Sequence, residues 1–527
     1  MSRSTPRTAS DQGTAPYAAA LMRHAQRETV NLMVPGHGAT PDGLAAELSE
    51  FIGERALALD IPPLIPGIDV GPASPLVEAT QLAADAWGAA RTWFLANGAS
   101  QANRMAALAI AGLGGGDTIV GQRSAHSSFT DGVLLGDLLP HFVYPSIDTE
   151  RGINHGVSPE SLDSALDAAR DSGATVGAVY VISPSYFGAV ADVAGLSAVA
   201  HAHGVPLVVD GAWGSHFGFH PELPESPTRL GADLTVSSTH KLGGSLTQSA
   251  MLHLSDGPFA DALAPLLERA YMMTQTTSAS ALLLGSLDVA RHALVHGADA
   301  IGETLEFVED FRNRLRADGR FGVISDGFGA FPDIVADDPL RVSIDVSVTG
   351  LSGHAVRDRL SAEHGIFLEI STAQAIVAFI GPGKHPNLGR FGDALFALAD
   401  RGAVGGAPGG AQGAAGVAGA AGGALGAAGA APAPTVEFPA LPQPGAMRTR
   451  PRAAYFGRHD IVPASEAVGR ISADSLAAYP PGIPNVVPGE EITAETVAFL
   501  QTVAASPIGY VRGALDPAVT HFRVLAE

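Results

Sequence analysis

The sequence contains no cysteine and, among its 527 residues, only two lysines, Lys241 and Lys384. The absence of cysteine excludes disulfides, thiolate metal ligands and a cysteine nucleophile, and we expect no metal ion in the functional site. Arginine supplies the rest of the 31 Lys and Arg residues. Since arginine and lysine do similar work on a solvated surface, a lysine kept in a small uncharged segment suggests that its amine is needed as an amine.

Positive charge and long apolar runs are also scarce. The chain has 31 basic against 53 acidic residues and a formal net charge of −22, which argues against non-specific nucleic-acid binding and against docking on anionic membranes. Outside one Gly/Ala tract no apolar run reaches the length of a membrane span, and the first residues lack the apolar core of a signal peptide. We therefore expect a cytoplasmic protein without nucleic-acid or membrane partners.

From about residue 76 to residue 330, short apolar runs alternate with helical patterns. Near-continuous apolar strands separated by helices predict a mostly parallel sheet covered on both faces, with ligands bound beyond the carboxyl ends of its strands. The predicted strands are TWFLA (92–96), DTIVG (117–121), VGAVYVIS (176–183), VPLVVD (205–210) and ADLTVSS (232–238).

The rest of the chain predicts further divisions. RVSIDVS (341–347) and AIVAFIG (375–381) are typical of strands, with a helical pattern between them, and indicate a smaller α/β region. Residues 402–434 are almost only Gly and Ala, which predicts a flexible insertion. The predicted division is a disordered N-terminus, an N-terminal segment, a large domain and a C-terminal domain interrupted by that insertion: 1–16, 17–75, 76–335 and 336–527.

Four side chains follow the predicted strands of the large domain. Lys241 comes shortly after ADLTVSS, Asp210 ends VPLVVD, His126 follows DTIVG, and Ser100 is placed to cap the helix after TWFLA. In a parallel sheet all four rise to one edge. Together they match what pyridoxal phosphate requires: an amine for its aldehyde, a carboxylate for its ring nitrogen, an imidazole for its ring face and a helix N-terminus for its phosphate.

Each of these residues also has an ordinary interpretation. A lysine is usually a solvated surface charge, an aspartate at a strand end is usually a turn residue, and a histidine beside a serine is usually a loop residue. The NGAS segment by itself is only a turn signal. Lys384, the other lysine, lies in an ordinary loop, GPGKHP. Only the joint arrangement around Lys241 favours the cofactor.

With these residues, the chain resembles the bacterial ornithine/lysine/arginine decarboxylase family. The most specific stretch is GADLTVSSTHKLGGSLTQSAMLHL (231–254), with support from VPGH (34–37), FLANGASQAN (94–103) and YPPGIPNVVPGEEIT (479–493). The resemblance implies an α/β fold of the aspartate-aminotransferase type (fold type I), a large domain with a mostly parallel sheet and a smaller α/β C-terminal domain. It is similar to the short form of the family, without an N-terminal wing domain.

The resemblance also implies roles for individual residues. Lys241 bonds to pyridoxal 5′-phosphate, His240 touches phosphate or substrate, and His126 stacks on the cofactor ring. Asp210 pairs with the ring nitrogen, with Ala212 and Trp213 packed near it. The predicted phosphate contacts are Ser100, Gln101 and Ser238, together with Ser278 reaching the site of a neighbouring subunit, which implies a homodimer or a higher homo-oligomer.

The chain departs from the family pattern on the substrate side. Ser127 stands where members usually carry a lysine, and Gly38 ends the usual PGHK motif. Ala279 stands where proline is common, and Gly211 and Trp213 flank Ala212 where the shorter members often have an acidic residue and a histidine. These changes leave the cofactor contacts in place and affect the prediction of substrate.

The leading hypothesis is decarboxylation of ornithine, lysine or arginine, with Glu369 in GIFLEIS receiving the cation of the substrate side chain. Another reaction of the same cofactor stays open: an aminotransferase, a lyase or a decarboxylase of another amino acid, since function depends on the site and not on the fold. A non-catalytic pyridoxal-binding homologue is a third reading, and a scaffold protein is the weakest. Glu369 could equally be an exposed residue at a strand end.

Overall fold

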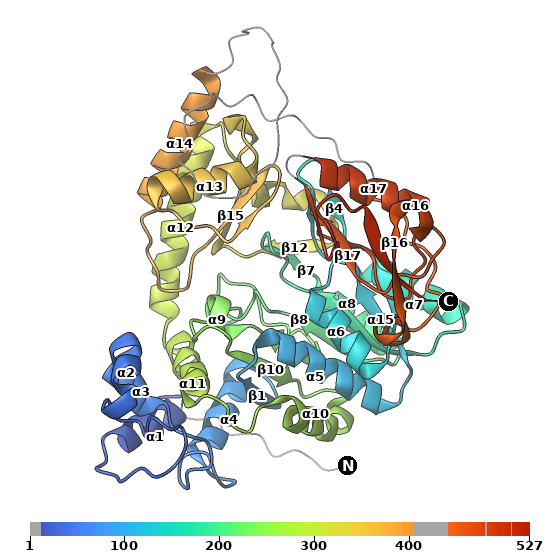
Figure 1. Cartoon of the computed structure of the whole chain (residues 1–527). Coiled ribbons are helices and arrows are strands. Elements are labelled where there is room, and N and C mark those ends of the chain that lie inside the picture. The colour runs from blue at the N-terminus through green and yellow to red at the C-terminus, as the bar shows by residue number, and fades with distance from the viewer. Residues whose placement is uncertain (1–11, 405–440, 480–481, 507–508, 527) are drawn as a thin grey trace.

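A seven-stranded sheet lies at the centre of the computed structural model, which describes residues 12–404, 441–479, 482–506 and 509–526 (Figure 1). The strand order is β1-β10-β9-β8-β6-β2-β3, and the strands from β9 to β3 run parallel to their neighbours, while β10 is antiparallel to β1 and β9. This confirms the predicted mostly parallel sheet. Its strands are β1 (Arg91–Leu95), β2 (Thr118–Gln122), β3 (Leu139–Val143), β6 (Val176–Ile182), β8 (Leu207–Asp210), β9 (Leu234–Ser237) and β10 (Ala250–Leu254).

Helices cover both faces of this sheet, as its apolar strands require. On one face α5, α6 and α10 pack over a cluster that includes Trp93, Met105 and Leu267, and on the other face α7 and α8 pack over Leu166, Val181 and Leu196. The helices of this region are α4 (Pro75–Trp87), α5 (Gly98–Leu113), α6 (Ser127–Gly136), α7 (Pro159–Asp171), α8 (Val193–Ala202), α9 (Thr239–Leu242), α10 (Ala260–Thr274) and α11 (Ala281–Val295).

The register of the strands brings their carboxyl ends to one edge. Ile182 pairs with Asp210, and Asp210 pairs with Val236 on β9. Because β10 is antiparallel to both of its neighbours, β1 also ends at this edge, where α5 begins. The segments that follow β1, β2, β8 and β9 therefore meet at one edge of the sheet, as the sequence predicts.

A smaller four-stranded sheet, β11-β13-β15-β14, lies beyond the long helix α12 (Ala298–Asp318), which runs from α11 toward it in Figure 1. It confirms the strands expected at 341–347 and 375–381, and its core is separate from that of the large sheet. Its elements are β11 (Gly322–Val323), β13 (Arg341–Asp345), α13 (Gly353–His364), β14 (Ile370–Ser371), β15 (Ala375–Phe379) and α14 (Leu388–Val404). Two small pairs lie beside it, β4 (Ile147–Asp148) with β5 (Ile153–Asn154) and β7 (Ala189–Ala191) with β12 (Ile334–Asp337).

The C-terminal part has its own core, built around Leu476, Leu500 and Phe522. A buried bidentate ion pair between Arg123, just after β2, and Glu490 ties it to the large sheet, with contacts of 2.5 and 2.8 Å. Its elements are α15 (Pro451–Phe456), β16 (His459–Pro463), α16 (Ala464–Ala467), β17 (Leu476–Tyr479), β18 (Pro484–Val486), α17 (Ala494–Ala505), β19 (Tyr510–Arg512) and β20 (His521–Leu525). Of the predicted insertion, residues 405–434 lie outside the described residues.

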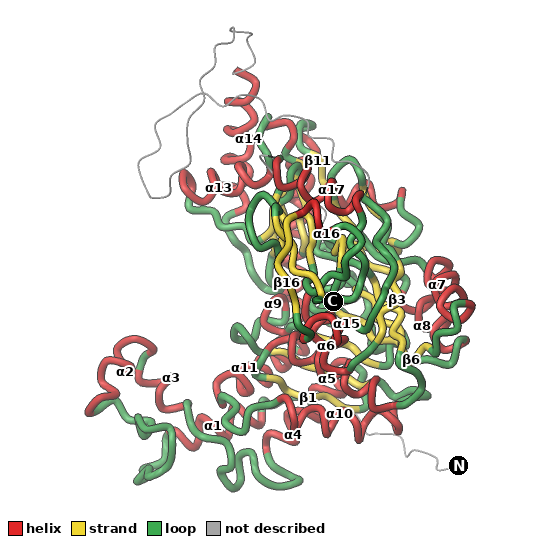
Figure 2. Tube along the Cα trace, turned by 45° about the vertical axis from the view of Figure 1, so that its right-hand side comes forward, coloured by secondary structure: helices red, strands yellow, loops and turns green. Residues whose placement is uncertain are grey.

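At the N-terminus, α1 (Pro16–Ala25), α2 (Ala46–Ile52) and α3 (Glu54–Leu59) precede α4, and Figure 2 shows α2 and α3 projecting away from the rest of the chain. Of the predicted N-terminal stretch, residues 1–11 lie outside the described residues; Gln12 donates a hydrogen bond to the carbonyl of Leu82. The predicted domain boundaries stay predictions. No helix within the described residues is long and apolar enough to cross a membrane.

Candidate active site at the edge of the large sheet

Lys241 lies on α9, just past the end of β9, and its amine is largely shielded from water. The Nζ atom sits 3.7 Å from the ring centroid of Trp213 and makes no hydrogen bond or ion pair with any described residue. Burial lowers the pKa of this amine from 10.5 to about 8, although the negative charges of Asp210 and Glu369 oppose the shift. The lysine is therefore prepared to act as a neutral amine near neutral pH.

Asp210, the last residue of β8, is held by three donors. Its Oδ2 accepts hydrogen bonds from Tyr180 Oη at 2.7 Å and from Asn103 Nδ2 at 3.0 Å, and its Oδ1 accepts one from the backbone N–H of Ala212 at 3.1 Å. The carboxylate is 5% exposed. Burial, together with the negative charge of Asp210, raises the pKa of Tyr180 well above its usual value, so this tyrosine stays a donor.

His126 is the N-cap of α6 and lies within reach of the same network. Its Nδ1 accepts from the backbone N–H of Ser128 at 3.2 Å and lies 2.8 Å from the hydroxyl of Ser128, which in turn accepts from Asn103 at 2.9 Å. Burial lowers the pKa of His126, with Asp210 opposing and Lys241 adding to the shift. The ring is therefore held in the neutral form, in a line of contacts that ends at Asp210.

The predicted phosphate contacts lie at the same edge. Ser100 is in the first turn of α5, and Ser238, 1% exposed, lies between β9 and α9 with its hydroxyl 3.3 Å from Nδ1 of His240. The prediction that Ser100 caps α5 is wrong, because the helix begins three residues earlier, at Gly98 with a positive φ of 71°, and its cap is Asn97. Ser100 thus stands among the first backbone N–H groups, which have no partner within the helix.

Two other predicted residues have different surroundings. Gln101 is buried, and its Nε2 donates to Thr274 and Gln275 at the end of α10, while its Oε1 has no hydrogen-bond partner among the residues that the structure describes. Ser278 is exposed, with its hydroxyl 3.1 Å from that of Thr276. Ser278 is not among the described residues that line the cavity beside the site.

That cavity has a volume of about 830 Å³ and is lined by all three parts of the chain. His126 and Tyr186 line it from the large domain, Glu369 from the smaller sheet, and Tyr510 and Arg512 from the C-terminal part. Lys241 is not among the described residues that line the cavity. Tyr186 connects the cavity to the surroundings of Lys241, because the Tyr186 and Trp213 rings pack edge to face, with centroids 5.6 Å apart and an interplanar angle of 70°. Glu369 is the one acidic residue among the described lining residues.

Sequence reasoning did not identify several residues of this site. Asn103 lies near the start of α5, and Tyr180 lies inside the apolar run of β6, where a polar group was the signal that could have found it. Arg512 donates from Nη2 to the hydroxyl of Ser127 at 3.3 Å. A cation from the C-terminal part of the chain therefore lies beside position 127.

The arrangement fits pyridoxal phosphate. The Lys241 amine is desolvated and without a polar partner among the described residues, Asp210 is fixed by donors from three segments, and both lie at an edge where a helix N-terminus is available. The phosphate of a cofactor could be held by the first turn of α5. The fold and the site together define a pyridoxal-phosphate enzyme of fold type I.

Comparison with known proteins gives the family. The chain matches the Orn/Lys/Arg decarboxylase major domain over residues 15–387 and that family's C-terminal domain over residues 441–507. It is 34% identical over 525 residues to the arginine decarboxylase of Bacillus subtilis (strain 168), covering 98% of this chain and 99% of that protein. The arginine decarboxylase of Halalkalibacterium halodurans is 32% identical over 530 residues, with 98% and 99% covered. This chain belongs to the Orn/Lys/Arg decarboxylase family.

Solved structures support the same fold. Lysine decarboxylase A from Pseudomonas aeruginosa superposes with a TM-score of 0.78 at 21% identity, covering 97% of this chain and 80% of that one. The Francisella novicida lysine decarboxylase LdcF gives a TM-score of 0.76 at 18% identity, covering 98% and 81%. These comparisons confirm the expected fold and the pyridoxal phosphate cofactor. They also confirm that the chain is an enzyme that decarboxylates a basic amino acid. The roles of individual residues stay predictions.

Proposed function

We propose that this chain is an arginine decarboxylase that converts arginine to agmatine and CO₂. The choice of arginine is supported by two relatives that match almost the whole chain and carry that name, at 34% and 32% identity. The observation that carries the chemistry is the desolvated amine of Lys241, at the same sheet edge as a firmly held Asp210.

In this proposal the residues at the sheet edge hold the cofactor. Lys241 would bond to its aldehyde, Asp210 would pair with its ring nitrogen, His126 would cover its ring, and Ser100 and Ser238 would contact its phosphate. Bound pyridoxal phosphate supplies a sink for the electrons that remain when the carboxylate leaves as CO₂.

The remaining steps belong to the protein. Asp210 would pair with the ring nitrogen and hold a proton there. The shielded environment around Trp213 disfavours the charged carboxylate and favours its loss. Lys241 or His240 then donates a proton to the α-carbon, in the place of the lost carboxylate. Burial lowers the pKa of His240, which disfavours the protonated imidazolium form that would donate this proton.

Glu369 is proposed to receive the guanidinium of the substrate. It lines the cavity, and its negative charge acts on Lys241 and His240, which supports a position near the reacting atoms. A carboxylate can accept two parallel hydrogen bonds from a guanidinium, a geometry that favours arginine over an amine.

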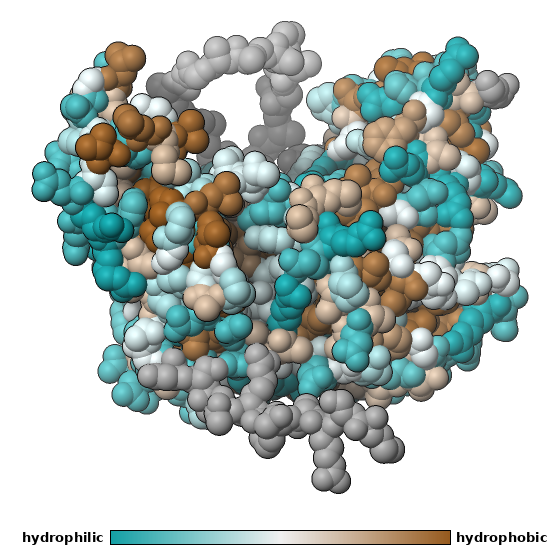
Figure 3. Space-filling view, turned by 90° about the horizontal axis from the view of Figure 1, so that it is seen from below, coloured by the Kyte–Doolittle hydropathy of each residue, from teal (hydrophilic) through white to brown (hydrophobic). Residues whose placement is uncertain are grey.

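The active unit is proposed to be at least a homodimer. Four apolar side chains of the N-terminal segment are strongly exposed, Val30 at 88%, Leu32 at 91%, Leu44 at 104% and Phe51 at 86%. Such exposure is unusual for a monomer surface. Figure 3 shows apolar surface on the left of the molecule, the side on which Figure 1 places α2 and α3. Exposed Ser278 would then contact the cofactor phosphate of the neighbouring subunit.

The test of the activity is the amine product. Purified protein supplied with pyridoxal phosphate should form agmatine and CO₂ from arginine, with much less product from lysine or ornithine, as measured by mass spectrometry. Lys241→Ala should abolish product, and Lys384→Ala, which removes the other, exposed lysine, should not. Cadaverine from lysine as the main product would overturn the choice of substrate, and an active Lys241→Ala would overturn the site.

Subunit complementation tests the role of Ser278. Ser278→Asp places a negative charge against the phosphate and should inactivate the homodimer, as Lys241→Ala does. Co-expression of the two variants should restore part of the activity, because mixed dimers contain one site with neither substitution. No recovery in mixed dimers, verified by two different affinity tags, would contradict the shared site.

A further inference from the structure

Trp213 lies between the catalytic lysine and the smaller sheet. Phe379, at the end of β15, stacks on the indole with ring centroids 4.7 Å apart and an interplanar angle of 16°. The Lys241 Nζ lies 3.7 Å from the centroid of the same indole. Both groups cannot occupy one face of the ring without overlap, so the amine and Phe379 lie on opposite faces. The position of the lysine amine therefore depends on where Trp213 is held.

Arg341, the first residue of β13, fixes the backbone of Trp213. Its Nη2 donates to the carbonyl of Trp213 at 3.1 Å, and its Nη1 donates to the carbonyls of Ser185 at 2.8 Å and Tyr186 at 3.1 Å. Its guanidinium carbon also lies 5.1 Å from the Trp213 ring centroid and 4.9 Å from that of Phe379. One side chain thus joins the Trp213 segment and the cavity-lining Tyr186 segment to the smaller sheet.

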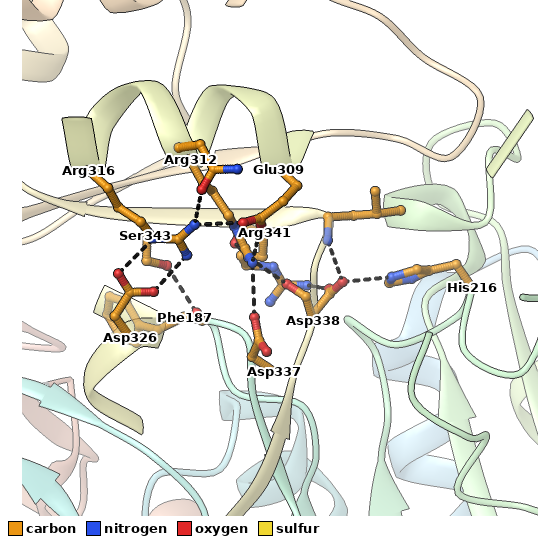
Figure 4. Close-up of polar contacts among 12 residues, drawn as sticks. Phe187, His216, Glu309, Arg312, Arg316, Asp326, Asp337, Asp338, Arg341 and Ser343 are labelled. Carbon is orange, nitrogen blue, oxygen red and sulfur yellow. Dashed lines mark hydrogen bonds and ion pairs between the residues drawn. The ribbon is translucent and has the colours of Figure 1, made fainter. Parts of the chain in front are cut away.

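Two further buried groups hold Arg341 in place (Figure 4). Asp338 accepts from Arg341 Nη2 through Oδ2 at 3.1 Å, and its Oδ1 lies 3.0 Å from Nε2 of His216. The side chains of all three residues are 0% exposed. Because the guanidinium is enclosed and directed at backbone carbonyls, it cannot bind substrate.

We propose that Arg341 is a positioning residue for Lys241, acting through the Trp213 indole that it and Phe379 hold against the lysine amine. The proposal rests on the proposed role of Lys241. In this proposal the smaller sheet holds the Lys241 amine in position for its bond to the cofactor. The sheet itself contributes no atom to that bond.

Arg341 also has an electrostatic effect on the lysine. Burial lowers the pKa of Lys241 most, Asp210 and Glu369 raise it, and the positive charge of Arg341 lowers it. His126 and His240 are the other titratable groups that sense this amine. An arginine held in place thus opposes the charge of the amine, and it also keeps the amine on the indole.

The experiment compares Arg341→Lys with Arg291→Lys. Arg291 is a matched control, because it is also 0% exposed, also pairs with an aspartate three residues earlier, Asp288, and also donates to backbone carbonyls, but lies on α11. The lysine replacements keep the charge and lose the forked contacts. The first measurement is the rate at which pyridoxal phosphate adds to apoenzyme as a function of pH, which reports the pKa of the Lys241 amine without catalysis.

We expect Arg341→Lys to shift the pH midpoint of cofactor addition and to lower kcat about 10²-fold with little change in KM. Arg291→Lys should lower the melting temperature but leave the midpoint and kcat unchanged. Phe379→Leu, which keeps the hydrogen bonds and the ion pair of Arg341, should move the midpoint in the same direction by less, and serves if Arg341→Lys does not fold.

The outcomes separate the two proposals. If Lys241→Ala still adds pyridoxal phosphate covalently, the proposed role of Lys241 fails. If only Lys241→Ala abolishes addition, and Arg341→Lys and Phe379→Leu keep the wild-type midpoint and kcat, Lys241 is the correct residue and the positioning role of Arg341 is wrong.

Discussion

The cofactor side of this site is built from one domain, whereas the substrate side is built from three parts of the chain. On the cofactor side, Asp210, Asn103, Tyr180 and His126 all belong to the large domain and form one hydrogen-bonded network at the edge of a single sheet. On the substrate side, the cavity is lined from the large domain, the smaller sheet and the C-terminal part. On the first side Asp210, Asn103 and Tyr180 are buried and His126 is exposed, and on the second side Glu369 and Arg512 are exposed.

This difference separates chemistry from selectivity. A buried network within one domain holds the reacting groups to a narrow geometry, because its members support one another. A cavity lined by distant segments can change its charge by substitution in any one of them without disturbing that network. The departures at Ser127 and Gly38 fit this division, since neither residue belongs to the cofactor-side network.

The largest expected effect concerns the charge of Asp210. Asp210→Asn keeps the shape and most hydrogen bonds but cannot hold a proton on the cofactor ring nitrogen, so kcat should fall about 10³-fold with arginine. The matched control is Asp233→Asn, a carboxylate that is also buried, but one residue before β9 begins. It should reduce thermal stability and leave kcat within a small factor of wild type. Equal losses of kcat would show that the comparison reflects stability and not chemistry.

On the substrate side, Glu369→Gln should act on binding. Loss of a charge-assisted hydrogen bond of about 1.5–3 kcal/mol predicts a rise in KM for arginine of about 10- to 100-fold, with kcat changed much less. Glu363→Gln, on exposed α13, is the control and should change neither constant. Steady-state kinetics give both values, and a fall in kcat without a rise in KM would place Glu369 on the cofactor side instead.

The sequence predicts the cofactor side better than the substrate side, for a physical reason. Lys241 and Asp210 directly follow or end buried strands, and a parallel sheet brings all such ends to one edge. The five predicted strands match β1, β2, β6, β8 and β9 within two residues, because each is a nearly continuous apolar run, whereas β3 and β10 were not predicted. The start of α5 could not be predicted, because it depends on the left-handed conformation of Gly98.

The substrate side depends on contacts between distant segments. Arg512 reaches Ser127 across 385 residues, and Arg341 reaches Tyr186 across 155. No periodicity or motif encodes such pairs, because they arise only when separately folded parts dock. Tyr180 is an intermediate case. The sequence predicts that it lies in a buried strand, but does not predict that Asp210 accepts its hydrogen bond.

A pH profile links the two sides. With a pKa of about 8 for Lys241, the neutral fraction of the amine should fall about tenfold for each pH unit below that value, and cofactor addition to apoenzyme should slow accordingly. Since the charges of Asp210 and Glu369 both raise this pKa, Asp210→Asn and Glu369→Gln should each move the midpoint to lower pH, and Asp210→Asn by more. Stopped-flow absorbance measures the rates, and Glu363→Gln should keep the wild-type midpoint.

The smallest expected effect lies at position 127. Ser127→Lys introduces the residue usual in the family, but here the new ammonium would meet Arg512, which now donates to the serine hydroxyl. Both positions are exposed, so the repulsion amounts to about 1 kcal/mol at most and kcat/KM should fall by about fivefold or less. The loss should shrink at high salt, because exposed charges are screened. Ser127→Gln, long and neutral, should show no salt dependence, and adding Arg512→Gln to Ser127→Lys should restore kcat/KM. If the double variant is no better than Ser127→Lys, Arg512 does not supply the cation that position 127 lacks.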